Sequence, residues 1–586
     1  MCSIEGTTSP DFDIRLFAQA NKCRGPDGTE YYHDNKVAFA HNLLAISPNP
    51  NKKRQPYVTD KGNVLVYNGE IFGLRDDQWD VEWLANYIEQ NGVKGLSNNI
   101  NGMWAFCWYE PSKNKITLCR DHFGIKPLYY TFHDDFLYFS STTLPLIALS
   151  FSLDIATHYK KHRAFPAFSF SKRFHDIYKH TDGFNPGMDT LFTRVYKLNP
   201  GEILEVDVNT NKRLASDNLW DDGYDLKPNY LWDRDEYEEI MTQCISEVCQ
   251  APDIKKTISL SGGLDSSLIA SIARNKDHIS ASSVHWQDVN IEAKDPSRHM
   301  MDELQMSKNT TKMLKMDHYI TEIPHNNEWV HDEVYNSMFG VPSWDIQRLL
   351  PRFYNITQAS KNGNKIYITG DCADELLTGY NGDYDIHSGE LRSNIESLRL
   401  IGHRTDYKPF DRDIGYRNLQ KVIPKHMFRD DLVNNRQMIK LMFHSDGFCT
   451  VLDHMCGYYG MESRVPFLHQ RLAKYLLRIP GQQKLAIDFN GPIKDKKDRK
   501  DYLWFMMGHY KGLLRDHMSH HYTDEVRNRM RKTGFSNPWD ARDEKKNKEL
   551  REEQYAIQKD KVKQGMVDIK DNFMYNLRSE IISEKV

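Results

Sequence analysis

The sequence of 586 residues lacks several features that define common protein classes. Its nine cysteines include no Cys-x-x-Cys pair, which argues against a zinc site and against a disulfide framework. No apolar run reaches the roughly 18 residues that a membrane span needs. The first residues contain neither the basic nor the apolar segment of a signal peptide. We therefore expect free thiols in a reducing cytoplasm.

A strong excess of one charge is also missing. The formal net charge is -4, so we expect no extended surface for nucleic acid or for an anionic membrane. The Gly-x-x-x-x-Gly-Lys-Ser/Thr loop of Walker-type kinases and ATPases does not occur. With 39% apolar and 27% charged residues, the composition is that of a soluble globular protein. The length suits about two to four domains.

The most informative stretch runs from residue 257 to residue 270. Residues 257–260 read as a short buried strand, and an apolar helical pattern begins again at Leu268. Such a turn offers backbone N–H groups at the positive end of a helix, where phosphates bind. A helix cap is the alternative reading of the Ser-Gly-Gly tripeptide alone. Asp265 favours the phosphate site, because a carboxylate beside phosphates requires a cation such as Mg²⁺ between them.

Residues 261–267, Ser-Gly-Gly-Leu-Asp-Ser-Ser, resemble the pyrophosphate loop of ATP pyrophosphatases, in the form found in glutamine-hydrolysing asparagine synthetases. The resemblance implies ATP and Mg²⁺ as cofactors, an acyl-adenylate intermediate, and release of AMP and pyrophosphate. The resemblance implies that Asp265 and Asp374 are the Mg²⁺ ligands. Lys500 matches the lysine that contacts pyrophosphate, although its charged neighbours also fit a solvated surface. The residues expected around ATP are Leu260, Ser261, Gly262, Gly263, Asp265, Ser266, Ser267, Thr369 and Gly370.

Motifs nearer the start of the chain extend the resemblance to the class II glutamine amidotransferase domain of the same family. They are Arg24-Gly25-Pro26-Asp27, Gln55-Pro56, Asn68-Gly69-Glu70-Ile71 and residues 120–130. The resemblance makes Cys2 the nucleophile, and its own α-amino group serves as base once the initiator methionine is removed. Asn68 and the Gly69 N–H would form the oxyanion hole. Glu70 and Asp80 would line the glutamine pocket, with Asp80 on the substrate α-ammonium.

Several positions depart from the family pattern. Leu43 stands where the family has an Arg that grips the α-carboxylate of glutamine. Asp371, which we assign to the acceptor step, replaces a Glu that is one methylene longer. His469 replaces the Asp that follows the Glu-x-Arg-x-Pro-Phe-Leu segment at 462–468. Residues 340–347, where substrate-selecting residues should lie, show no clear aspartate pocket.

The order of expected elements predicts two domains, of α/β and α+β class. Short strands separated by turns fill residues 1–225. The resemblance identifies this part as an N-terminal-nucleophile (Ntn) hydrolase αββα sandwich, with an insertion at about 152–189 that is either a solvated segment or a partner surface. Helices alternate with strands over residues 234–540, as in a doubly wound parallel sheet of the ATP-pyrophosphatase, adenine nucleotide alpha hydrolase-like type. Residues 541–586 read as a charged helical tail.

These features predict a cytoplasmic amidotransferase in which ammonia from glutamine passes internally to a carboxylate activated by ATP. Asparagine formed from aspartate is the leading product. A different carboxylate acceptor, in a biosynthetic or nucleobase-modifying pathway, is the alternative within this class. A β-lactam synthetase-like cyclase is disfavoured, because that reaction needs no ammonia and hence no Cys2. A non-catalytic regulatory protein is disfavoured by the intact loop at 261–267 together with Asp374 and Lys500. The expected partners are small-molecule substrates, without membrane or nucleic acid, and the sequence leaves a homodimer open.

Overall fold

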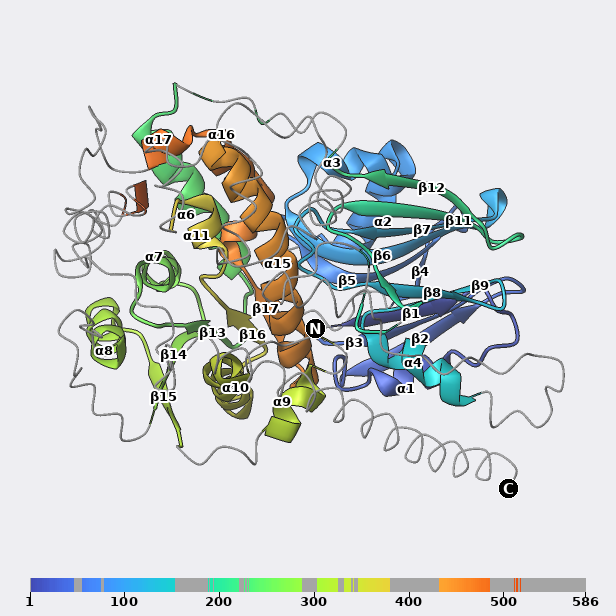
Figure 1. The fold of residues 1–586 in the computed structure, drawn as a ribbon, viewed down its shortest axis with the longest axis horizontal. Helices are drawn as coiled ribbons and strands as arrows, with labels where there is room; N and C mark the ends of the chain where they lie inside the picture. Colours follow the sequence, from blue (N-terminus) through green and yellow to red (C-terminus); the bar gives the residue numbers. More distant parts are fainter. Residues whose placement is uncertain are drawn as a thin grey trace, which may run out of the picture.

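The computed structural model shows two halves packed side by side, one built from antiparallel strands and one from a parallel sheet with helices (Figure 1). The residues that the structure describes are 2–46, 55–74, 78–152, 188, 190–192, 194–220, 226, 229, 231–286, 303–324, 331–338, 341, 346–379, 432–484, 511, 513, 514 and 517. Within this part of the chain, no helix combines the length and the apolar character needed to cross a bilayer.

The N-terminal half consists of two antiparallel six-stranded sheets stacked on each other (Figure 1). The first sheet has the order β10-β8-β9-β1-β3-β2 and the second β12-β11-β7-β6-β5-β4. The strands are β1 (Ser3–Thr7), β2 (Gly28–His33), β3 (Ala38–Leu43), β4 (Tyr57–Val58), β5 (Val64–Ile71), β6 (Gly102–Glu110), β7 (Lys115–Arg120), β8 (Tyr129–His133), β9 (Phe136–Ser140), β10 (Tyr196–Lys197), β11 (Glu202–Asp207) and β12 (Arg213–Asn218).

The two faces of each sheet bury different cores, because successive side chains of a strand point to opposite faces. Val64 and Val66 of β5 join Phe39 of β3 in the core between the sheets. Leu65 and Tyr67 of β5 instead pack in the core beneath α2 (Asp80–Asn91). Helices α1 (Arg15–Ala20) and α4 (Thr143–Ser152) cover the outer face of the first sheet, and the short segments η1 (Val93–Gly95), α3 (Leu96–Asn99) and η2 (Pro111–Lys113) complete this half. The predicted αββα sandwich is confirmed.

The C-terminal half is built on a five-stranded sheet of order β15-β14-β13-β16-β17, and all its paired strands are parallel. In Figure 1, α7 and α8 lie on one side of this sheet and α10 on the other. The strands are β13 (Lys256–Ser259), β14 (Ile279–Trp286), β15 (His318–Ile323), β16 (Ile366–Ile368) and β17 (Glu462–Arg464). The helices are α6 (Arg234–Cys249), α7 (Leu264–Ala273), α8 (Glu303–Leu314), α9 (His331–Ser337), α10 (Ile346–Lys361), α11 (Ala373–Leu376), α15 (Leu432–Tyr458), η6 (Pro466–Leu468), α16 (Gln470–Arg478) and α17 (Gly481–Lys484).

The chain leaves β13 for β14 on one side and returns to β16 on the other side of β13. Such a reversal of strand order opens a crevice at the carboxyl ends of the two strands, where open α/β sheets bind ligands. The predicted doubly wound parallel sheet is confirmed. The predicted insertion at about 152–189 falls almost wholly outside the described residues, as does the whole tail 541–586, and the domain boundaries stay predictions.

Candidate active sites

Cys2 immediately precedes β1, where the main chain of Leu44 contacts its thiol and the side chain of Arg24 contacts its carbonyl group. The Leu44 N–H donates to Cys2 Sγ at 3.4 Å, and Arg24 Nε donates to the Cys2 carbonyl oxygen at 3.4 Å. Burial raises the pKa of the Cys2 thiol, and the positive charge at the start of the chain opposes this only in part. The thiol therefore needs a base before it can act as a nucleophile.

Strand β5, which packs against β1 across the sandwich, carries the predicted oxyanion residues. Asn68 is 1% exposed, and neither its Oδ1 nor its Nδ2 has a hydrogen-bond partner among the residues that the structure describes. A Cβ atom at Gly69 would lie 2.1 Å from the Met103 carbonyl oxygen, so only glycine fits there. A buried amide without a partner is costly in a folded protein, and this one is suited to receive a ligand.

Glu70 and Asp80 bring negative charge to the same region. Asp80 is the first residue of α2, and Glu70 lies on β5 two positions after Asn68. Burial first, and then the carboxylates of Asp80 and Glu70, raise the pKa of the Tyr67 phenol well above its usual value. Asp80 also contributes to the raised pKa of the Cys2 thiol. Asp80 thus lies near both the Cys2 thiol and the Tyr67 phenol, and Glu70 lies near that phenol as well.

The predicted phosphate loop lies between β13 and α7, as the sequence indicates. Gly262 has φ 72°, a left-handed conformation that favours glycine. The Gly263 N–H donates to Ser261 Oγ at 3.2 Å. A Cβ atom at Gly370, which follows β16, would lie 3.0 Å from the Cβ of Asp265. The structure therefore brings the predicted ATP residues of both strand ends together. They are Leu260, Ser261, Gly262, Gly263, Asp265, Ser266, Ser267, Thr369 and Gly370.

Asp265 and Asp374, the two predicted Mg²⁺ ligands, converge on the ammonium group of Lys511. Lys511 Nζ lies 2.6 Å from Asp374 Oδ1 and 2.5 Å from Asp265 Oδ2, and it also contacts Asp265 Oδ1. Burial opposes the charge on Lys511, but the two carboxylates outweigh it and raise the pKa above its usual value. Two carboxylates directed at one cation are a donor set that fits Mg²⁺, with phosphate oxygens and water as further ligands.

Lys511 is a member of this cluster that our sequence analysis did not single out. We assigned the pyrophosphate-binding role to Lys500, which lies outside the described residues. Lys511 is followed closely by two buried leucines, Leu513 and Leu514, whereas charged residues surround Lys500. Apolar neighbours are the signal that distinguishes a lysine anchored near the core from one in a solvated run.

Asp371, assigned to the acceptor step, is held by groups of its own half. Arg352 Nη2 donates to both carboxylate oxygens, at 2.8 and 3.0 Å, and Thr369 Oγ1 donates to Oδ2 at 2.8 Å. Burial opposes the charge on Arg352, yet the Asp371 carboxylate raises the pKa of the guanidinium. Most of the segment 340–347, from which we expected acceptor selection, lies outside the described residues.

His469, another departure from the family pattern, is buried at the contact between the halves. Its Nε2 lies 3.0 Å from Glu247 Oε2, and its ring stacks on Phe72 at 6.1 Å between centroids. The substitution therefore joins α6 to the segment after β5.

Two family models correspond to the two halves and give the class of the protein. The glutamine amidotransferase domain model matches residues 1–216, and the asparagine synthase model matches residues 237–571. The chain belongs to the asparagine synthase family and carries an N-terminal glutamine amidotransferase domain.

Three curated relatives illustrate the distance within this family. Asparagine synthetase [glutamine-hydrolyzing] 2 of Bacillus subtilis (strain 168) is 25% identical over 515 residues, which cover 80% of this chain and 64% of the relative. Asparagine synthetase B of Escherichia coli (strain K12) is 23% identical, with coverages of 83% and 76%. The amidase chry2 of Gibberella zeae is 24% identical, with coverages of 61% and 54%. The chain thus spans less than two thirds of the first and third relatives.

Proposed function

We propose that this protein is a glutamine-dependent amidotransferase that activates a carboxylate with ATP, and that it forms asparagine from aspartate. The observation that carries the proposal is the convergence of Asp265 and Asp374 on one cation beside the phosphate loop. Transfer of ammonia between two sites accounts for the N-terminal half, which contains Cys2 and the buried Asn68 amide without a partner among the described residues. ATP fits the family and the loop, whereas Mg²⁺ rests on the two carboxylates alone.

In the amidotransferase half, Cys2 Sγ attacks the side-chain amide carbon of glutamine. Its proton passes to the α-amino group that removal of the initiator methionine exposes. Asn68 Nδ2 and the Gly69 N–H donate to the oxygen of the tetrahedral intermediate. Ammonia leaves as the thioester forms, and water then releases glutamate. Asp80 pairs with the substrate α-ammonium during both steps, and Glu70 lines the same pocket.

In the synthetase half, loop N–H groups and the start of α7 bind the phosphates of ATP. Mg²⁺, when bound by Asp265 and Asp374, supplies charge neutralisation at the phosphate oxygens. Lys500 stays the predicted contact of pyrophosphate, and Lys511, whose ammonium group contacts both carboxylates, is a second candidate for that role. A carboxylate oxygen of the acceptor attacks the α-phosphorus, pyrophosphate leaves, and ammonia displaces AMP to form the amide.

A different carboxylate acceptor is the second candidate, and one observation favours it. Asp371 is shorter than the family's usual Glu and is bound to Arg352, so it is poorly placed to contact aspartate in the usual way. The relative named an amidase also shows that family names at this distance are not uniform. A non-catalytic protein is disfavoured, since such a protein has no need of two assembled sites.

The proposal is tested by measuring pyrophosphate release with ATP, Mg²⁺ and ammonium chloride against a panel of carboxylic acids. We expect AMP, pyrophosphate and asparagine with aspartate. Activity on another acid, with none on aspartate, would move the conclusion to the second candidate. ADP and phosphate as products would contradict the pyrophosphatase assignment, and a lack of turnover with every acid would favour a non-catalytic protein.

Leu43 carries a prediction about glutamine affinity. It lies at the end of β3 opposite Gly28 of β2, partly buried, where an aliphatic side chain cannot pair with the α-carboxylate of glutamine. A charge-assisted pair contributes about 1.5–3 kcal/mol. We therefore expect Leu43→Arg to lower the KM for glutamine by about 10- to 100-fold and to leave kcat unchanged.

The control for this variant is Leu43→Met, which changes shape without adding charge. Glutamate release measured over a range of glutamine concentrations separates KM from kcat. If Leu43→Arg leaves KM unchanged, another cation already binds the carboxylate. The candidates are Lys52, Lys53 and Arg54, which lie outside the described residues.

A further inference from the structure

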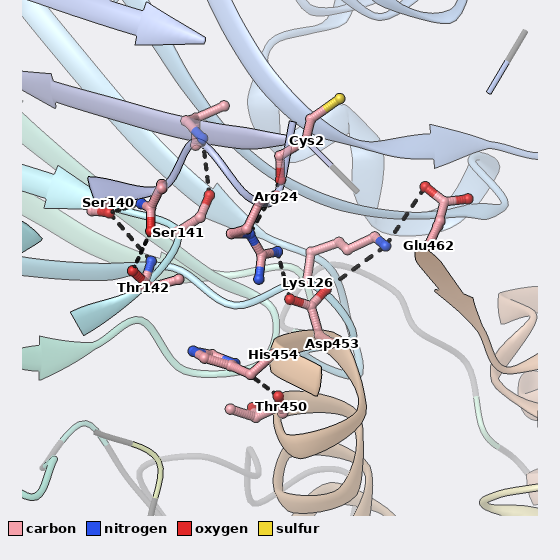
Figure 2. A network of polar contacts seen from close by, with 12 residues as sticks. Cys2, Arg24, Lys126, Ser140, Ser141, Thr142, Thr450, Asp453, His454 and Glu462 are labelled. Carbon is pink, nitrogen blue, oxygen red and sulfur yellow. Dashed lines mark hydrogen bonds and ion pairs between the residues drawn. The ribbon is translucent and has the colours of Figure 1, made fainter. Parts of the chain in front are cut away.

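Six charged side chains alternate in sign across the contact between the two halves, and we call them the interdomain charge chain. Figure 2 shows its central part, in which Lys126 lies between Asp453 and Glu462, and Arg24 reaches from Asp453 toward Cys2. The members in order are Glu70, Arg464, Glu462, Lys126, Asp453 and Arg24. The successive distances are 3.7 Å, 2.9 Å, 3.8 Å, 3.8 Å and 2.6 Å.

Both ends of this chain return to the glutamine pocket. Arg464 Nη2 faces Glu70 Oε2, and at the other end Arg24 Nε donates to the carbonyl oxygen of Cys2. Arg24, Lys126 and Glu70 belong to the amidotransferase half. The synthetase half contributes Asp453 from α15, and Glu462 and Arg464 from β17. The synthetase half therefore touches both the nucleophile's main chain and a wall of the substrate pocket through charges.

Five of the six side chains in the interdomain charge chain are almost fully buried, and we infer that the chain orients its side chains more than it stabilises the fold. The side chains of Lys126 and Asp453 are 0% exposed, and those of Arg24, Glu462 and Arg464 are 2% exposed. Burial disfavours charge on Glu462, yet Lys126 and Arg464 lower its pKa, so it is ionised at neutral pH. Apolar residues often replace buried ion pairs without loss of stability. What the charges add is a directed hydrogen bond from Arg464 to Glu462 and another from Arg24 to Asp453.

Arg464 is held by three acceptors of its own half. Its Nε donates to Glu462, and its Nη1 donates to the carbonyl oxygens of Val248 at 2.9 Å and Gln250 at 2.7 Å, near the end of α6. The guanidinium also lies over the Phe72 ring at 5.7 Å from its centroid. Glu70 has a side chain that is 30% exposed. A fixed cation beside a partly exposed carboxylate restricts where that carboxylate points.

Asp453 acts in the same way on the other side of the pocket. Its Oδ1 accepts from Arg24 Nη2 at 2.6 Å, and both side chains are almost fully buried. Arg24 then reaches the Cys2 carbonyl with its Nε. Since the Cys2 thiol is one residue from β1, a shift of this carbonyl moves the thiol relative to Asn68.

We propose that Arg464 and Asp453 are positioning residues for glutamine hydrolysis: Arg464 orients Glu70 on the substrate, and Asp453 fixes the main chain of Cys2 through Arg24. The proposal rests on the glutaminase function proposed above. It assigns to the synthetase half a part in the first reaction, although all groups expected to touch glutamine belong to the other half.

The two arms of the interdomain charge chain affect different kinetic constants of glutamine hydrolysis. Both constants are measured on the full-length protein as glutamate formation from glutamine. Arg464→Lys keeps the charge and loses the planar fork, so we expect KM for glutamine to rise about 10-fold, with kcat little changed. Asp453→Asn weakens the hold on Arg24, so we expect kcat to fall by about 10-fold, with KM little changed. Asp446→Asn is the matched control, because Asp446 on the same helix pairs with Arg120 at 2.9 Å and with Lys197, outside the charge chain.

A double variant tests whether Arg464 acts through Glu70. If it does, Arg464→Lys adds nothing to the KM of Glu70→Gln, and the two changes are not additive. Additive effects would overturn this arm, and an Asp446→Asn enzyme that loses as much kcat as Asp453→Asn would overturn the other. Melting temperatures and ammonia-dependent synthesis, measured on the same proteins, report folding. A wild-type protein without glutaminase activity would refute the proposed function itself.

Discussion

Asp265→Asn should abolish acceptor-dependent formation of AMP and pyrophosphate while glutamine hydrolysis continues. Asp265 shares one cation with Asp374 next to the phosphate loop, and the amide keeps the size of the side chain while removing its charge. Loss of one preorganised electrostatic contact in a reacting site lowers kcat by about 10²–10³-fold. The amidotransferase half uses other residues, so glutamate release measures whether the protein is otherwise intact.

The matched control is Asp253→Asn, at an exposed turn just before β13. It makes the same chemical change in the same half, and we expect pyrophosphate release at the wild-type rate. Pyrophosphate release by Asp265→Asn at that rate as well would show that our assignment of the metal-binding carboxylates is wrong. Binding of Mn²⁺, followed by its paramagnetic resonance in the absence of acceptor, gives a second measure that does not depend on turnover.

Cys2→Ala should stop glutamine-dependent synthesis and spare synthesis from ammonium chloride. The sulfur is the only nucleophile that we place in the glutamine pocket, and removal of an enzyme nucleophile lowers kcat by about 10⁴-fold or more. Ammonia supplied from solution bypasses this step. Amide formation with each nitrogen source, on the same preparation, gives the two rates to compare.

Cys23→Ala is the control, because Cys23 is an exposed thiol one residue before Arg24. We expect it to keep both activities. Wild-type protein that never hydrolyses glutamine, with or without ATP and acceptor, would show that the amidotransferase half has lost its activity. Equal loss of both activities in Cys2→Ala would instead point to a structural role of the thiol.

The sequence predicted those parts of the sites that lie within one short segment. Residues 261–267 could be interpreted because a strand, a glycine turn and a helix start follow one another, and the backbone geometry is local. The same holds for Asn68 and Gly69 on a single strand. The order of elements predicted the parallel sheet and the family resemblance predicted the αββα sandwich, and both architectures are confirmed.

Contacts between distant segments could not be predicted in this way. Lys511 reaches Asp265 across 246 positions, and Arg24 reaches Asp453 across 429. Nothing in the neighbours of a lysine or an arginine states which carboxylate it will meet after folding, because that depends on how whole elements pack. Lys500 lies outside the described residues, so its assignment to pyrophosphate stays a prediction.

The ion pair between Arg24 and Asp453 also bears on the order in which the protein matures during translation. Ribosomes add about 5–20 residues per second, so the 429 positions that separate these partners take about 20–90 s to make. During that interval the nascent amidotransferase half has Arg24 and Lys126 without their acidic partners. We therefore expect Cys2 to reach its final position only after α15, which carries Asp453, has been synthesised and has packed against the first half.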